Sequence, residues 1–197
     1  MIKRILGLDP SGRDGKSSGF CLIYDSEIIA IGEFKTLSYL IEYIYLLKPE
    51  LVAIDSPLNY PSEGPYRKCD LLLKKNALNP LPLNMPGMRQ LIERALKIIN
   101  VLENINAKYI ETFPAGALRM LGFRKPKSLK ERKRYFERIR TLFSLRSIVN
   151  ASKLTKDEFD AFICAVTGYA FTIGRYREYA SEDCKIILPV IFTNSAL

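Results

Sequence analysis

The chain of 197 residues contains no histidine. This absence excludes nucleophilic catalysis by Ser-His-Asp or Cys-His groups. It also excludes zinc and non-haem iron sites that depend on imidazole ligands. Any metal ion in this protein must therefore be bound mainly through oxygen or sulfur atoms.

Cysteine is scarce, and long apolar runs are missing. The four cysteines are far apart and form no CxxC pair, so a zinc cluster is not expected. We expect all four to be small buried hydrophobic side chains, with Cys69 the most exposed. No signal-peptide apolar region follows Met1, and no apolar run is long enough to span a membrane. We therefore expect a cytoplasmic protein that does not associate with membranes.

Positive charge is in excess and is concentrated in one segment. The chain has 30 Lys and Arg against 21 Asp and Glu, a net charge of +9, and most of this excess lies in residues 124–140 (RKPKSLKERKRYFERIR). An apolar stripe at helical spacing predicts a docked helix with a cationic outer face. Such a face fits a phosphate backbone, of DNA or RNA alike. A solvated charged face and a membrane-surface helix are the alternatives.

Hydrophobic periodicity predicts an α/β fold. An antiparallel meander of three strands is expected over 2–34, followed by strands at 51–55 and 107–111. The first, fourth and fifth strands are expected to be parallel neighbours in the centre of a mixed five-stranded sheet flanked by helices. The helices are predicted at 37–47, 66–75, 88–104, 114–121, 128–143 and 156–171.

No linker or repeat divides the chain, so we expect a single domain over 1–197. Residues 56–87 hold six of the eleven prolines and are read as an insertion. Residues 185–192 are expected to form a final strand at an edge of the sheet, because they contain Pro189.

Each of the three central strands ends on an acid: Asp9, Asp55 and Glu111. Ligand sites in open sheets form outside the carboxyl ends of parallel strands, so these carboxylates are expected at one edge. The alternative is that strands simply end where polar residues begin.

Two further acids, Asp157 and Asp160, lie three residues apart on one helical face. A capping box from Thr155 to Glu158 opens this helix. An acid in a first turn also complements the helix dipole, which explains Asp157 without a function. Asp160 lies deeper and beside an apolar stretch, where an acid needs a partner.

Clustered carboxylates repel one another, by about 4 kcal/mol for two charges 4 Å apart at an effective dielectric constant of ~20. Such a cluster is stable when it binds cations, and an all-oxygen site suits one or two Mg²⁺ or Mn²⁺ ions. Ions held in this way promote phosphodiester hydrolysis.

Residues 10–17 (PSGRDGKS) nearly match a phosphate-binding P-loop. The match fails at the first glycine, and a strand rather than a helix follows. Arg13 and Lys16 remain candidates for contact with substrate phosphate.

Six segments occur in an order that resembles a known family: GLDPSG, GF, AIDSPL, RKCD, ETFP and KDEFDAFICA. Over about residues 5–170 the chain is similar to the domain of unknown function 429 family, predicted nucleases of the ribonuclease H-like superfamily. The resemblance implies a ribonuclease H-like fold and nuclease activity.

The resemblance also assigns individual positions. Asp9 matches the first-strand aspartate, Asp55 the acid ending the fourth strand, and Asp157 with Asp160 the paired acids of the last helix. Glu111 with Pro114 matches the acid on the fifth strand. Arg67, Cys69 and Asp70 match a segment without an assigned role.

One position departs from the family pattern. Relatives often have histidine immediately before the paired acids of the last helix, and here that residue is Lys156. A lysine neither shuttles protons nor orients water well at neutral pH, so this departure bears on the rate and the proton route.

The predicted function is metal-dependent hydrolysis of nucleic acid. The expected metal ligands and catalytic groups are Asp9, Asp55, Asp157 and Asp160, with Glu111 as a further catalytic candidate. The expected nucleic-acid contacts are Arg13, Lys16, Arg67, Lys127, Lys130, Arg132, Lys133 and Arg134. Two alternatives are a nucleic-acid-binding module that no longer cuts and a phosphotransferase of the actin or sugar-kinase type. The sequence does not distinguish endonuclease from exonuclease, and it is compatible with a homodimer.

Overall fold

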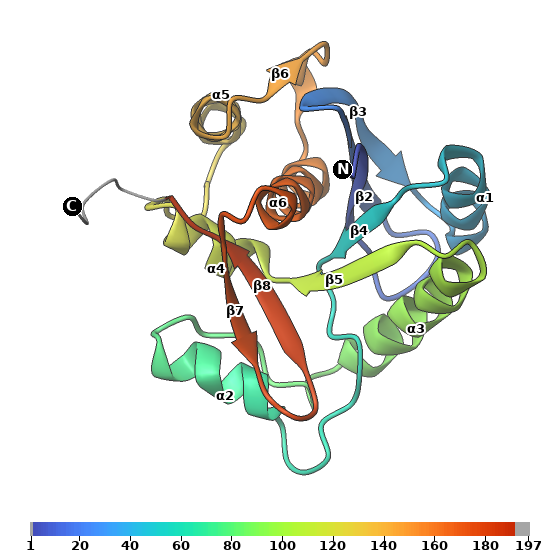
Figure 1. Ribbon diagram of the computed structural model, residues 1–197. Coiled ribbons are helices and arrows are strands. Elements are labelled where there is room, and N and C mark those ends of the chain that lie inside the picture. Colours follow the sequence, from blue (N-terminus) through green and yellow to red (C-terminus); the bar gives the residue numbers. More distant parts are fainter. Residues whose placement is uncertain (1, 192–197) are drawn as a thin grey trace.

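An eight-stranded mixed sheet forms the centre of the computed structural model, which describes residues 2–191 (Figure 1). From one edge to the other the strands are β6 (Arg146–Ser147), β3 (Glu27–Phe34), β2 (Ser18–Tyr24), β1 (Arg4–Asp9), β4 (Leu51–Ile54), β5 (Lys108–Thr112), β8 (Lys185–Pro189) and β7 (Tyr176–Ala180). The strands β1, β4, β5 and β8 are parallel to one another. The predicted meander β1–β2–β3 and the parallel centre are both confirmed.

The sheet is wider than the five strands predicted, because β6, β7 and β8 join it. The expected edge position of the last strand was wrong: β8 lies between β5 and β7, and β7 forms that edge. Pro189 is the last residue of β8, where a missing N–H is tolerated. The predicted end of this strand, Phe192, lies outside the described residues.

Helices cover both faces of the sheet (Figure 1). They are α1 (Leu37–Leu47), α2 (Lys68–Lys75), α3 (Met88–Asn104), α4 (Pro114–Met120), α5 (Leu129–Leu142) and α6 (Lys156–Thr172), with a 3₁₀ turn, η1, at Ala151–Lys153. The helices α4, α5 and α6 bury their apolar side chains against one face. The helices α1 and α3 pack on the other face. The sheet thus has a hydrophobic core on each side.

The start of α6 is fixed by the predicted capping box. The N–H of Thr155 donates to Glu158 Oε2 at 2.7 Å, and the N–H of Glu158 donates to Thr155 Oγ1 at 3.1 Å. Two donors at the helix end are satisfied in this way. The first residues of α6, which include the paired acids, therefore have a defined position.

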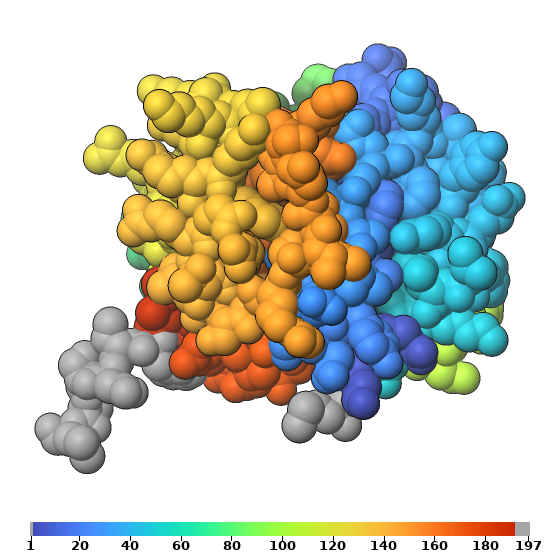
Figure 2. Space-filling model, turned by 90° about the horizontal axis from the view of Figure 1, so that it is seen from above, coloured from blue at the N-terminus to red at the C-terminus, as the bar shows by residue number. Residues whose placement is uncertain are grey.

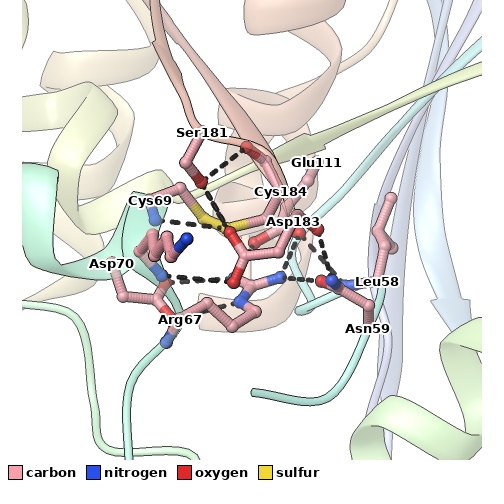
Figure 3. The surroundings of a disulfide bond; sticks show 10 residues. Leu58, Asn59, Arg67, Cys69, Asp70, Glu111, Ser181, Asp183 and Cys184 are labelled. Atoms are coloured by element: carbon pink, nitrogen blue, oxygen red, sulfur yellow. Dashed lines mark hydrogen bonds and ion pairs between the residues drawn. A yellow bond between two sulfur atoms is a disulfide. The ribbon is translucent and has the colours of Figure 1, made fainter. Parts of the chain in front are cut away.

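The proline-rich segment 56–87 connects β4 to α3 and contains α2. A disulfide between Cys69 and Cys184 ties α2 to the β7–β8 turn (Figure 3). The expectation that all four cysteines are small buried hydrophobic side chains, with Cys69 the most exposed, was wrong: Cys69 is fully buried and bonded to Cys184, which is half-buried. The other two cysteines, Cys21 and Cys164, are free and buried as expected.

No helix within residues 2–191 combines the length and the apolar character that a membrane span requires. Cytoplasmic location stays a prediction, and the disulfide is the feature that opposes it, because such bonds are rare in reducing compartments.

Candidate active site

Two glycines allow α6 to approach the sheet closely. A Cβ atom on Gly7 of β1 would lie 2.2 Å from the backbone N of Ala165, and one on Gly19 of β2 would lie 2.0 Å from the backbone O of Asp157. Neither position accepts a side chain while the helix stays in place. These contacts set the first turns of α6 directly beside the end of β1.

The ends of β1 and β4 bring Asp9 and Asp55 together. Leu8 pairs with Ile54 in the parallel register, and the N–H of Asp55 donates to the carbonyl of Leu8 at 2.9 Å. Side chains alternate along a strand; because Leu8 and Ile54 contribute to the core under α1 and α3, the acids that follow them belong to the α6 face. Asp9, Asp55 and Asp160 of α6 line one cavity of about 430 Å³.

Burial raises the pKa of these acids. Desolvation, followed by repulsion from Asp160, raises the pKa of Asp9 to about 8. Desolvation and the charge of Asp9 raise the pKa of Asp55 well above its ordinary value. Within residues 2–191, the carboxylates of Asp9 and Asp55 make no hydrogen bond or ion pair. Both side chains are half-buried, and desolvated carboxylates without a partner are stabilised by a bound cation or a shared proton.

Lys156 is the nearest positive charge to the cluster. Its Nζ atom lies 3.2 Å from Asp160 Oδ2 and 3.7 Å from Asp157 Oδ1. Burial opposes the charge of this ammonium group, but the carboxylates of Asp160 and Asp9 outweigh that effect and raise its pKa. The two acids on α6 therefore share a cation supplied by their own helix.

Within the described part of the chain, no three cysteine, aspartate or glutamate side chains are positioned together to hold a metal ion. The donor chemistry nevertheless fits a hard divalent cation, because Asp9 and Asp55 are half-buried, unpaired carboxylates beside Asp160. Binding an ion there requires these side chains to adjust their rotamers.

Glu111 lines the same cavity but belongs to a different group of side chains (Figure 3). In the register of β4 and β5, Glu111 pairs with Ile54, the residue before Asp55. Because side chains alternate along a strand, Glu111 points to the face of the sheet opposite to that of Asp55. There it accepts hydrogen bonds from Arg67 Nη1 at 2.8 Å and from the N–H of Leu58 at 3.0 Å. A catalytic role for Glu111 stays a prediction.

All five N–H groups of the buried Arg67 guanidinium are engaged. Nε and Nη2 donate to Asp70, Nη1 and Nη2 donate to Glu111, and Nη1 also donates to Asn59. No donor remains for a phosphate, and the residue is 1% exposed. The geometry gives no support to the expected contact between Arg67 and nucleic acid. Arg67 and Asp70, the two ends of the segment RKCD, instead form part of the buried wall of the cavity.

Thr112 is a site residue that the sequence did not reveal. It follows Glu111, the partner of Ile54, and therefore lies on the α6 face of the sheet, as Asp55 does. It lines the cavity, and its Oγ1 atom is buried without a hydrogen-bond partner among the described residues. Side-chain alternation along β5 could have identified Thr112. It directly follows Glu111, the predicted end of the strand, and so points to the other face of the sheet.

Basic residues flank the acidic centre on two sides. Lys16 lines a hollow of about 400 Å³ together with Asp9, Lys156 and Asp157. On the other side Lys125 lines the main cavity and also a neighbouring hollow that contains Arg119 and Arg124. Asp9 and Lys156 line both the main cavity and the Lys16 hollow, so the main cavity adjoins a basic hollow on each side.

The predicted basic helix is α5, which contributes a broad part of the molecular surface (Figure 2, yellow to light orange). Lys130 and Arg134 are exposed there, Lys127 is exposed just before the helix, and Arg13 is exposed in the β1–β2 loop. Lys133 and Arg132 are half-buried, and Arg132 Nε donates to the carbonyl of Leu154 at 3.0 Å. Arg132 thus also holds the segment that leads into α6.

Comparison with known proteins agrees with this architecture. The model of a family described as a protein of unknown function (DUF429) matches residues 7–183, and the chain belongs to this family. Among solved structures it is similar to "T. thermophilus RuvC in complex with Holliday junction substrate", with 12% identity, a TM-score of 0.52 and coverage of 87% of this chain and 96% of that one.

A second similar structure, "Thermus thermophilus RuvC structure", has 12% identity, a TM-score of 0.51 and the same coverage. At this identity the likeness concerns the fold, which is ribonuclease H-like, as the motifs implied. No curated protein matches the chain.

Proposed function

We propose that the protein is a metal-dependent nuclease that hydrolyses phosphodiester bonds in DNA or RNA. The observation that carries this proposal is the convergence of Asp9, Asp55 and Asp160 on one cavity. They come from β1, β4 and α6, which are adjacent elements of the sheet and its covering helix. One of the similar folds is described in complex with a Holliday junction, which supports a nucleic-acid substrate.

Asp9, Asp55 and Asp160 would hold Mg²⁺ or Mn²⁺, with Asp157 as a further ligand. When bound, such an ion supplies water activation and neutralises charge on the leaving oxygen. The chain itself contributes the partial burial of Asp9 and Asp55, which desolvates the two carboxylates while leaving them open to the cavity. Because both carboxylates lack a partner within residues 2–191, their affinity for a cation is not reduced by competing hydrogen bonds.

The flanking cations would bind the backbone of the substrate. Lys16 on one side and Lys125 with Arg124 on the other offer positive charge along adjoining hollows. Lys127, Lys130 and Arg134 would extend this attraction over α5, with Arg13, Lys133 and Arg132 as weaker contributors. The contacts are to phosphate, so affinity would depend strongly on salt and weakly on sequence.

A nucleic-acid-binding module without cleavage activity is the second candidate. The observation that favours it is the pairing of Lys156 with Asp160, which neutralises part of the cluster without any metal. This candidate predicts binding that is indifferent to divalent cations.

Cleavage and binding assays separate the two candidates. The purified protein is incubated with labelled single-stranded, duplex and branched DNA and RNA in Mg²⁺, Mn²⁺ or EDTA, and binding is measured in parallel in EDTA. The nuclease cleaves at least one substrate only when a divalent cation is present. Tight binding with no cleavage of any substrate would overturn the nuclease assignment.

A further inference from the structure

The position of Lys156 divides the acidic cluster into two unequal halves. Lys156 is the first residue of α6, and its ammonium group contacts the carboxylates of Asp157 and Asp160, at 3.7 Å and 3.2 Å. Asp9 and Asp55 form the other half, where no contact to a basic side chain occurs within residues 2–191. One half therefore already has a cation, and the other half has none.

The backbone of Lys156 is held firmly by its neighbours. Thr155 closes the capping box with Glu158, and its Oγ1 atom also donates to Glu33 Oε1 at 2.6 Å. The close contact between Gly19 and Asp157 fixes the next residue against β2. The lysine side chain thus starts from a fixed point at the rim of the cluster, although 60% of it is exposed.

Lys156 also lies where the hollows meet. It lines the main cavity with Asp9, Asp55 and Asp160, and it lines the Lys16 hollow with Asp9 and Asp157. A cation at this junction is close to the carboxylates and also to any substrate phosphate that binds over them. Lys125 also borders the main cavity, and Lys16 borders the second hollow, whereas the guanidinium of Arg67 in the cavity wall is already fully hydrogen-bonded.

We propose that the Lys156 ammonium group takes the place of a second divalent ion, so that the cluster binds only one. This inference rests on the proposed function, because it concerns the same metal site. The single ion belongs to the Asp9–Asp55 half, with Asp160 shared between the ion and the lysine. If all four aspartates are ionised, a divalent ion and Lys156 together offset three of the four negative charges. A second divalent ion would have to displace the lysine from Asp160.

The test is the number of Mn²⁺ ions bound per chain, measured by calorimetric titration with MnCl₂ in the absence of nucleic acid. The wild-type protein is expected to bind one ion, and Lys156→Gln is expected to bind two. Lys156→Arg keeps a positive charge and is expected to bind one. Lys153→Gln, a change of the same type at an exposed lysine in η1, is the matched control and is expected to bind one.

Electron paramagnetic resonance gives a second readout that does not depend on activity. Two adjacent Mn²⁺ ions couple magnetically, so coupling is expected in Lys156→Gln and not in the wild type. Two ions in the wild type, or one ion in Lys156→Gln, would overturn the role of Lys156 and leave the proposed nuclease function standing. Absence of Mn²⁺ binding in every variant, Lys156→Gln included, would overturn both.

Discussion

The guanidinium of Arg67 and the carboxylate of Glu111 form a buried ion pair, in which Nη1 donates to Oε2 at 2.8 Å. Asp70 binds the other side of the same guanidinium, so one arginine is hydrogen-bonded to two acids. This pairing separates Glu111 from the Asp9–Asp55 cluster, although all of these residues border one cavity. Arg67 and Glu111 therefore shape the cavity wall.

Replacing Glu111 is expected to affect folding more than metal binding. Glu111→Ala removes the acceptor for buried donors of Arg67 and for the N–H of Leu58, and it should lower the free energy of unfolding by about 3–5 kcal/mol. Chemical denaturation measures this change. Glu93→Ala is the matched control, because it removes an exposed ion pair with Arg89 and should cost less than about 1 kcal/mol. If Glu111→Ala keeps its stability but loses Mn²⁺ binding, Glu111 is a metal ligand.

The stability of the metal-free protein should fall as the pH rises. The pKa of Asp9 is about 8 in the folded protein and near 3.8 in the unfolded chain, so between these values the folded state holds a proton that the unfolded state has released. Folding then becomes less favourable with increasing pH across this window. Thermal denaturation in EDTA at pH 5 and pH 8 should show the loss.

Asp9→Asn removes the carboxylate charge and should raise the free energy of unfolding at pH 8 by about 1–3 kcal/mol. Each kcal/mol corresponds to a rise of roughly 2–4 °C in the melting temperature. The variant should also lose less stability than the wild type between pH 5 and pH 8. Equal pH dependence in the two proteins would show that Asp9 does not carry the raised pKa.

Gly19→Ala tests the close packing of α6. The added methyl group would lie 2.0 Å from the backbone O of Asp157, so the first turn of the helix must move. A loss of about 3 kcal/mol is expected, together with weaker Mn²⁺ binding. Gly12→Ala is the control, since its nearest neighbour is a backbone oxygen at 3.3 Å. A Gly19→Ala protein with wild-type stability would contradict the packing described for this helix.

The disulfide can be counted chemically. Denatured, unreduced protein should present two free thiols, those of Cys21 and Cys164, and reduction should raise the number to four. Because the bond joins residues 115 positions apart, a Cys69→Ser/Cys184→Ser variant should lose about 2–4 kcal/mol of stability. A reductant should destabilise the wild type and leave this variant unchanged. Four thiols before reduction would show that the bond does not form.

The sequence predicted the centre of the sheet because β1 and β4 are apolar runs closed by Asp9 and Asp55, and such runs have a strong pattern. The strand β5 extends one residue beyond Glu111, the end predicted for it. The sequence did not predict β7, whose residues are mostly polar and lie at an edge with little burial. The bond between Cys69 and Cys184 depends on the packing of α2 beside the β7–β8 turn, which no local spacing encodes.

The candidate site was predictable in part. Strand ends and helical spacing indicated Asp9, Asp55 and Asp160, because each position follows from local structure. Glu111 is separated from these acids because it pairs with Ile54 and not with Asp55. The pairing of residues between β4 and β5 cannot be read from the sequence. The same pairing places Thr112 in the cavity.

The most direct test of the account is the rate of Mn²⁺-dependent cleavage by the wild type and by Asp55→Asn on the substrate that the wild type cleaves best. Asp55→Asn should lower this rate by about 1,000-fold, which corresponds to about 4 kcal/mol of transition-state stabilisation, while binding of the substrate persists. Glu42→Gln, an exposed change on α1, should cleave at the wild-type rate. Cleavage by Asp55→Asn at the wild-type rate, or no cleavage by the wild type of any DNA or RNA, would contradict the account.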